Sequence, residues 1–527
     1  MTDVRKKTGR TGLTFLALGA ALVLATGGAQ AQNTLVIAQP VTPEGFDGDA
    51  VRPGTQHVVV QTYEGLTRYP RVERDGRQYH DPSRVDGHFA ERWTVSPDGK
   101  TYTFKLREGV KSPMGNEMTS ADVEFGWNKS FAQKRTGAFI ANVSNVTEVK
   151  AKSKYEVDFT LGAPSAILLS ALTLYLPGVY DSKVMKENAT AEDPWALKYT
   201  DAHTAGFGAY HLQEIRPGEQ ATFVANPNYF RLKPYFDRVI WRAVPSEANR
   251  STLLRSGQVQ WVERPSMQQV VELQKDPRVK VQAATGRAIA SIRMNPKFKP
   301  FEDVRVRRAM NYAVDKEAIK KGVFFGTGTV AKSIVPPIVD GYDPSFYAYD
   351  FDLNKAKALL TEAGYPNGFE AELLYAGLWP WEETMAIQVA DQLKAAGLRI
   401  TAKRISDSDM RARSAPAVMD MPFFSFEDGP IVLDPVYNNY LLAHSKGVSN
   451  RAAYNNPAVD AAVDAARQEL DRTKRNELMR QVQKQWMEDA PWIVTTYPDT
   501  FEAMAPNIVG WVHFADEHER WVDLRRQ

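Results

Sequence analysis

The segment from Gly206 to Val262 constrains the fold more than any other part of the chain, because it predicts several elements in a fixed order. Two polar strands flank Pro217 and Gly218, which mark a tight turn. A third strand is expected over 238–244 and a helix over 246–257. A hairpin that leads to a strand and then to a helix indicates a mixed α/β protein.

Helices and strands also alternate after residue 285. Apolar residues recur at helical spacing after the expected N-caps Asp303 and Asp352, and Asn456 before a proline marks another helix start. This alternation predicts an α/β unit with a largely parallel sheet. The first third of the chain is expected to be rich in strands and turns, with strands at 34–39, 101–106 and 155–161, a turn at 96–99, and a helix within 58–69.

The N-terminus has the pattern of a secretory signal peptide over residues 1–31. Basic residues precede an apolar run from Leu13 to Ala25, and Ala29 to Ala31 fit a small-x-small cleavage site. The alternative is a membrane anchor, but this run is shorter than the roughly 20 residues that span a bilayer. The chain has no cysteine, which excludes disulfides and a lipid-modified cysteine. We therefore expect a protein that is free in the periplasm and is not a lipoprotein.

The net charge gives no reason to expect nucleic acid or a membrane surface as a partner. The whole chain carries +2, and residues 1–31 contribute +3 of it, which leaves −1 for the remainder.

Several segments resemble, in the same order, the dipeptide/oligopeptide-binding family of bacterial ABC importers, the extracellular solute-binding proteins of family 5. Besides 206–262, the similar segments lie at 42–47, 63–66, 96–110, 119–123, 301–309 and 313–317. The resemblance implies an α/β, two-lobed periplasmic-binding-protein fold of the large type, with the ligand cleft between the lobes. By this analogy lobe one comprises 32–285 and 496–527, with an extra subdomain at about 70–204, and lobe two comprises 286–495.

The resemblance implies a periplasmic protein that captures a di- or oligopeptide and delivers it to ABC permease subunits that have a cytoplasmic ATPase. It is expected to be a monomer without cofactors. The same role for an opine, an oligosaccharide or a metal chelate remains open. A secreted hydrolase is a further alternative, but the chain lacks the His-Glu-x-x-His, Gly-x-Ser-x-Gly and Ser-x-x-Lys motifs. No catalytic residue and no metal ligand is therefore expected.

Three segments supply candidate ligand-binding residues. Glu44, Gly45 and Phe46 lie in the loop after the first strand. Trp379 and Trp381 lie in a loop after a predicted strand, where open α/β sheets bind ligands. The two tryptophans could form a stacking wall over the ligand, or one of them could pack against the next helix.

The third segment runs from Pro422 to Pro435 and contains Phe426, Glu427, Asp428 and Asp434. Peptide-binding members of the family carry an acid here that pairs with the peptide α-ammonium. This chain departs from their pattern, because Phe426 stands where tryptophan is usual. Glu427 or Asp428 could still hold the ammonium. The alternatives are a turn at Asp428 and a helix cap at Asp434.

Overall fold

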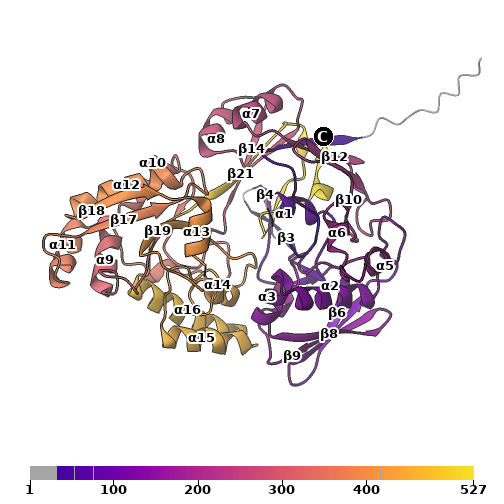
Figure 1. Ribbon diagram of the computed structural model, residues 1–527, viewed down its shortest axis with the longest axis horizontal. Coiled ribbons are helices and arrows are strands. Elements are labelled where there is room, and N and C mark those ends of the chain that lie inside the picture. The colour runs from indigo at the N-terminus through magenta and orange to yellow at the C-terminus, as the bar shows by residue number, and fades with distance from the viewer. Residues whose placement is uncertain (1–32, 51, 53, 75, 416, 515) are drawn as a thin grey trace, which may run out of the picture. The chain divides into compact units, whose positions relative to one another are not determined.

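The computed structural model describes residues 33–527 except residues 51, 53, 75, 416 and 515 (Figure 1). The predicted signal peptide lies outside the described residues. Among the described helices, none has the length and apolar character needed to cross a bilayer.

One sheet has seven strands and confirms the hairpin and strand predicted within 206–262. Its order is β10 (Tyr210–Arg216), β11 (Gln220–Ala225), β12 (Arg238–Ala243), β1 (Thr34–Gln39), β13 (Trp261–Glu263), β21 (Asp499–Met504) and β14 (Lys280–Thr285). Strand β1 pairs in parallel with β12 and β13. The predicted helix is α7 (Glu247–Arg255), which Ser246 caps by accepting a hydrogen bond from Asn249 N.

The chain between β1 and β10 forms smaller sheets and short helices. The predicted turn at 96–99 joins β6 (Ala90–Val95) to β7 (Thr101–Leu106), and Gly99 N donates to Ser96 O at 2.9 Å. The helix predicted within 58–69 is shorter and earlier, because α1 spans Thr55–Val59 and the chain then turns into β2. Between α1 and β2, Gly65 lies against the backbone of Leu172 with no room for a Cβ atom. The elements are β2 (Thr67–Arg68), β3 (Arg71–Arg74), β4 (Arg77–His80), β5 (Asp86–Gly87), β6 (Ala90–Val95), β7 (Thr101–Leu106), α2 (Ser120–Gln133), α3 (Thr136–Val143), β8 (Val146–Ser153), β9 (Glu156–Leu161), α4 (Leu168–Ala171), α5 (Ser182–Glu187) and α6 (Leu197–Thr200).

The second large sheet has six strands, and the prediction that it is largely parallel is wrong. Its order is β16 (Thr329–Val330), β20 (Trp492–Tyr497), β15 (Ile289–Met294), β19 (Phe423–Asp428), β17 (Glu370–Tyr375) and β18 (Arg399–Arg404). Two of its neighbouring pairs, β19–β17 and β17–β18, are parallel, and the other three pairs are antiparallel. The chain enters this sheet from β14 along β15 and returns along β20 to β21, so these neighbouring strands run in opposite directions.

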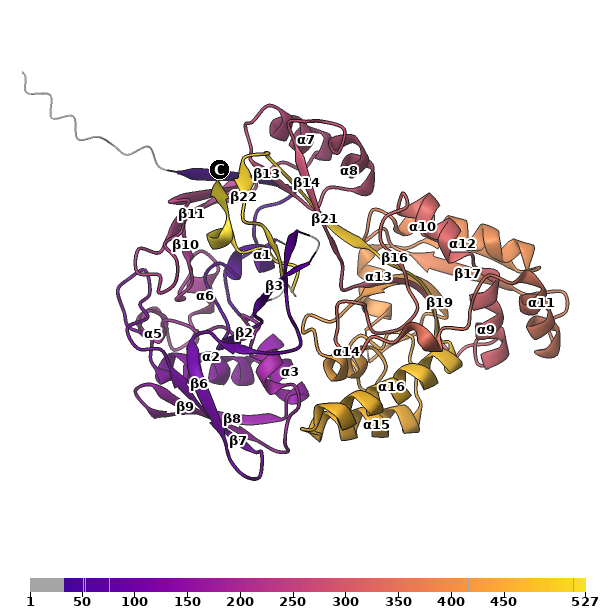
Figure 2. The same cartoon turned by 180° about the vertical axis from the view of Figure 1, so that it is seen from behind.

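Helices alternate with these strands as the sequence predicts, and they begin at the expected caps (Figures 1 and 2). Asp303 accepts a hydrogen bond from Arg305 N, Asp352 from Lys355 N, and Asn456 from Ala458 N. The helices after β14 are α9 (Val304–Ala313), α10 (Lys316–Val323), α11 (Leu353–Glu362), α12 (Glu382–Ala395), α13 (Asp407–Arg413), α14 (Pro435–Leu442), α15 (Pro457–Gln468) and α16 (Arg472–Asp489). Helices α8 (Met267–Leu273) and α7 pack near β13 and β14.

The C-terminal segment returns to the first half of the chain. Strand β23 (Val512–His513) pairs in parallel with β4, and β22 (Ile508–Val509) pairs with β24 (Arg525–Arg526). Phe514 therefore lies against His80 of β4, and Asp523 against Arg71 of β3. This return brings charged residues from the two ends of the chain into one place.

Candidate functional site

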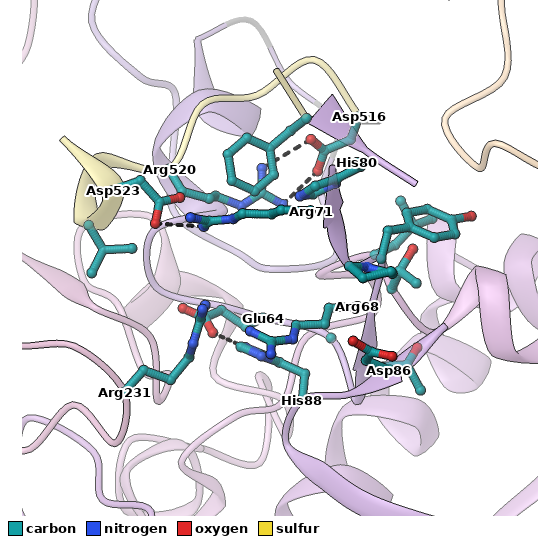
Figure 3. Close-up of a pocket in the computed structure, with 18 of the residues that line it drawn as sticks. Glu64, Arg68, Arg71, His80, Asp86, His88, Arg231, Asp516, Arg520 and Asp523 are labelled. Atoms are coloured by element: carbon teal, nitrogen blue, oxygen red, sulfur yellow. Dashed lines mark hydrogen bonds and ion pairs between the residues drawn. The ribbon is translucent and has the colours of Figure 1, made fainter. Parts of the chain in front are cut away.

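A cavity of about 340 Å³ lies between β2, β4 and the C-terminal segment (Figure 3). Small-molecule sites commonly have volumes of about 300–1,000 Å³, so this cavity suits a small solute. The six-stranded sheet is formed by the chain between residues 289 and 497. Of the described lining residues, only Ile431, which follows β19, comes from this part of the chain. The lining residues are Glu64, Gly65, Thr67, Arg68, Tyr69, Pro70, Arg71, His80, Asp86, His88, Thr173, Leu174, Tyr229, Arg231, Ile431, Phe514, Asp516, Arg520, Val522 and Asp523.

Ion pairs form much of the cavity wall. Figure 3 shows Arg71, His80, Asp516, Arg520 and Asp523 on one side. Arg71 pairs with Asp523 at 2.6 Å, and Arg520 pairs with Asp516 at 2.8 Å. These pairs neutralise both carboxylates within the protein.

The opposite wall contains Glu64 beside His88 (Figure 3). The His88 ring nitrogen Nε2 is hydrogen-bonded to Glu64, and the Tyr229 hydroxyl donates to it at 2.9 Å. Burial raises the pKa of Glu64, but the contact with His88 outweighs burial and leaves the pKa below its ordinary value. Glu64 is therefore an ionised and already paired carboxylate.

Arg68 differs from the other cavity arginines. Its Nε atom is buried and has no hydrogen-bond partner among the described residues. Burial and the nearby charge of Arg231 lower the pKa of Arg68, and Asp86 opposes this only in part. Both causes destabilise the charged form of the Arg68 guanidinium. An anion placed beside Arg68 would relieve them and would gain a charge-assisted hydrogen bond.

The predicted residues of the first loop do not line this cavity. Phe46 is fully buried and packs edge-on against Phe223, with ring centroids 6.1 Å apart. Gly45 has a φ of +88°, and Glu44 is exposed. The next residue, Asp47, binds Lys129 Nζ at 2.7 Å. The loop is thus anchored in the core, and a role for Glu44, Gly45 and Phe46 in ligand binding stays a prediction.

The structure brings Trp379, Trp381 and Phe426 together. The two indole rings stack with centroids 5.7 Å apart, and Trp379 meets Phe426 edge-on at 5.1 Å. Trp381 also packs against Phe324, as expected for a tryptophan that supports the start of a helix. Both tryptophans are half-buried and lie outside the cavity lining. The stacking wall over a ligand therefore stays a prediction.

Asp428 is occupied by groups of the protein itself. It pairs with Arg293 at 3.1 Å and with Arg451 at 3.2 Å, and the Ser449 hydroxyl donates to it at 3.1 Å. Arg293 is fully buried and lies over the ring of Trp492 at 3.7 Å. The carboxylate of Asp428 is therefore the counter-charge of a buried arginine.

Glu427 and Asp434, the other two acids of this segment, also interact with groups of the protein itself. Burial, assisted by the charge of Glu517, raises the pKa of Glu427 to about 8, so that this carboxyl is mainly protonated at neutral pH. Asp434 is buried and caps α14 by accepting hydrogen bonds from Val436 N and Tyr437 N at 2.8 and 3.2 Å. The helix cap at Asp434, which we considered as an alternative to ligand binding, is therefore present.

None of the ligand-binding residues predicted from the sequence lines this cavity. Glu64 and Tyr229 lie in segments that we assigned to the fold alone. Arg68, Arg71 and the run from Asp516 to Asp523 were not considered as ligand-binding residues. The available signal was the density of charged residues in that run.

Comparison with solved structures identifies the class of fold. NikA from Brucella suis, solved with Fe(III)-EDTA, superposes with a TM-score of 0.82 at 22% identity, covering 94% of this chain and 100% of that one. A dipeptide-binding protein from Pseudoalteromonas, solved with Met-Leu, gives a TM-score of 0.80 at 21% identity, with the same coverage. The predicted two-lobed periplasmic-binding-protein fold is confirmed.

The sequence comparisons then give the family. Residues 84–450 match the model of the bacterial extracellular solute-binding proteins, family 5, and the chain belongs to this family. It is 28% identical to the dipeptide-binding protein of Escherichia coli over 531 residues, covering 94% of this chain and 96% of that protein. It is 27% identical to heme-binding protein A of Haemophilus influenzae over 503 residues, covering 91% and 90%.

Proposed function

We propose that this protein is the periplasmic receptor of an ABC importer and that it captures a short peptide in the cavity around Arg68. The observation that carries the proposal is the buried Arg68 Nε, which lies at a cavity of about 340 Å³ and has no hydrogen-bond partner in the part of the chain that the structure describes. The terminal carboxylate of a di- or tripeptide is an anion of the right size to accept this hydrogen bond. Hydrogen bonds to charged groups contribute about 1.5–3 kcal/mol, enough to orient a small solute.

The similar proteins support a peptide more than the other solutes. Relatives include the dipeptide-binding protein of Escherichia coli and a di/tripeptide-binding protein of Pseudomonas aeruginosa. An opine remains the alternative, because the neighbour AgaA was solved with agropinic acid, and carboxylates of any origin could satisfy Arg68.

We also propose how the protein reaches the periplasm and how it delivers its solute. Residues 1–31 would direct the chain to the periplasm, and the lack of cysteine argues against a lipid anchor. There the loaded monomer would dock on permease subunits, and a cytoplasmic ATPase would drive transport. The protein itself would bind the solute without changing it and would need no cofactor.

The test is titration calorimetry with mixed-sequence libraries of di- and tripeptides, using protein recovered from the periplasmic fraction of a Gram-negative host. We expect saturable binding and recovery of every peptide intact when the mixtures are analysed by mass spectrometry. Cleavage of peptides would indicate a hydrolase. Recovery only from the cytoplasm, or no heat of binding with either library, would contradict the proposal.

A further inference from the structure

Two carboxylates near the segment from Glu427 to Ile431, those of Asp428 and Glu517, are each shared by two arginines. Arg293 and Arg451 both pair with the single carboxylate of Asp428. Close by, Arg264 and Arg287 lie 3.6 and 3.5 Å from the single carboxylate of Glu517. Each carboxylate is thus shared by two guanidinium groups, and neither is available to a cationic ligand group.

Three of the four carboxylates that line the cavity have partners within the protein, and the charge of the fourth, Asp86, acts on Arg68. Glu64 is held by His88 and Tyr229, and Asp516 by Arg520. Asp523 pairs with Arg71 through Oδ1, while its Oδ2 is buried and has no hydrogen-bond partner within the described part of the chain. A free acceptor on a neutralised carboxylate suits an amide N–H, which needs a hydrogen bond and brings no charge.

Arg68 is the cavity arginine whose Nε atom is buried and has no hydrogen-bond partner among the described residues. The positive charges of Arg231, Arg71 and Arg107 act on it, against the single opposing charge of Asp86. The cavity therefore favours a ligand with a negative charge at one end and a neutral polar group at the other.

We propose that the protein recognises its solute through an anionic group at Arg68 and does not require a charged amino terminus. Peptides with an acylated amino end, and similar N-substituted carboxylates, then bind as well as free peptides. This inference rests on the proposed function and names the class of solute that the same site accepts.

The experiment compares one mixed-sequence dipeptide library in three chemical forms: free, N-acetylated and C-amidated. Native mass spectrometry of the wild-type protein with each form measures the bound fraction and the mass of the bound peptides. We expect N-acetylation to change the apparent Kd by less than about 3-fold. We expect C-amidation to raise it by about 10-fold or more, because the hydrogen bond to a charged acceptor is lost.

The outcomes separate the inference from the proposed function. A free library that binds while the acetylated one is weakened 10-fold or more overturns the inference and leaves a peptide receptor. Equal binding of the amidated and free forms overturns the role of an anion at Arg68. A protein that binds none of the three forms contradicts the proposed function and the inference with it.

Discussion

Replacing Asp47 by alanine is expected to lower the free energy of unfolding by about 3–5 kcal/mol, because it leaves a buried charge without its partner. Lys129 has no exposed side-chain surface, and its Nζ atom lies 2.7 Å from Asp47. The Tyr180 hydroxyl also donates to Asp47 and would lose its acceptor. Urea unfolding of the variant and the wild type measures the effect.

The matched control is Asp201→Ala. Asp201 pairs with Arg52 at 3.5 Å, but both side chains are largely exposed, so a loss of less than about 1 kcal/mol is expected. Burial raises the pKa of Asp47, but Lys129 outweighs burial and lowers it below 3.8. The stabilisation is therefore present above pH 3.8 and is lost as the pH falls through the lower value in the folded protein. Equal losses in both variants would show that the Asp47 pair is not buried as described.

Replacing Asp428 by alanine is expected to have an effect of similar size, about 3–5 kcal/mol. The change leaves Arg293, which is fully buried, beside Arg451 without the carboxylate that both share. Removal of one partner of a buried pair costs more than the pair contributes, because the remaining charge stays desolvated. The loss is measured by urea unfolding of the ligand-free protein.

The control for Asp428 is Glu370→Ala, which removes an exposed carboxylate paired with Arg399 at 2.7 Å and is expected to cost less than about 1 kcal/mol. The same variants also distinguish a structural role of Asp428 from a role as the acid that binds the ligand. If Asp428→Ala were as stable as the wild type but bound free dipeptides 10-fold more weakly, Asp428 would be a ligand-binding acid and our description would be wrong.

Features that depend on neighbouring residues were predictable from the sequence. The hairpin around Pro217 and Gly218 and the caps Asp303, Asp352 and Asn456 follow from turn chemistry and from side chains that accept backbone hydrogen bonds. Each of these signals lies within a few residues of the structure that it specifies. For this reason they were identified without knowledge of the rest of the fold.

Features that depend on distant parts of the chain were not predictable in this way. The direction of β15 and β20 follows from the route of the chain between two sheets, which helical and strand periodicity do not encode. The partners of Asp428 come from β15 and from a loop after α14, so a local pattern could not show that this acid is neutralised. The cavity likewise combines Arg68 with Asp523, from opposite ends of the chain.

The most direct test of the account is the affinity of the Arg68→Gln variant for the mixed dipeptide library, measured by calorimetry. The matched control is Arg92→Gln, which changes an exposed arginine on β6. We expect Arg68→Gln to weaken binding by about 10-fold or more with an unchanged urea midpoint, and Arg92→Gln to bind as the wild type does. An Arg68→Gln protein that binds the library with wild-type affinity would contradict the central claim that this cavity holds the solute by its carboxylate.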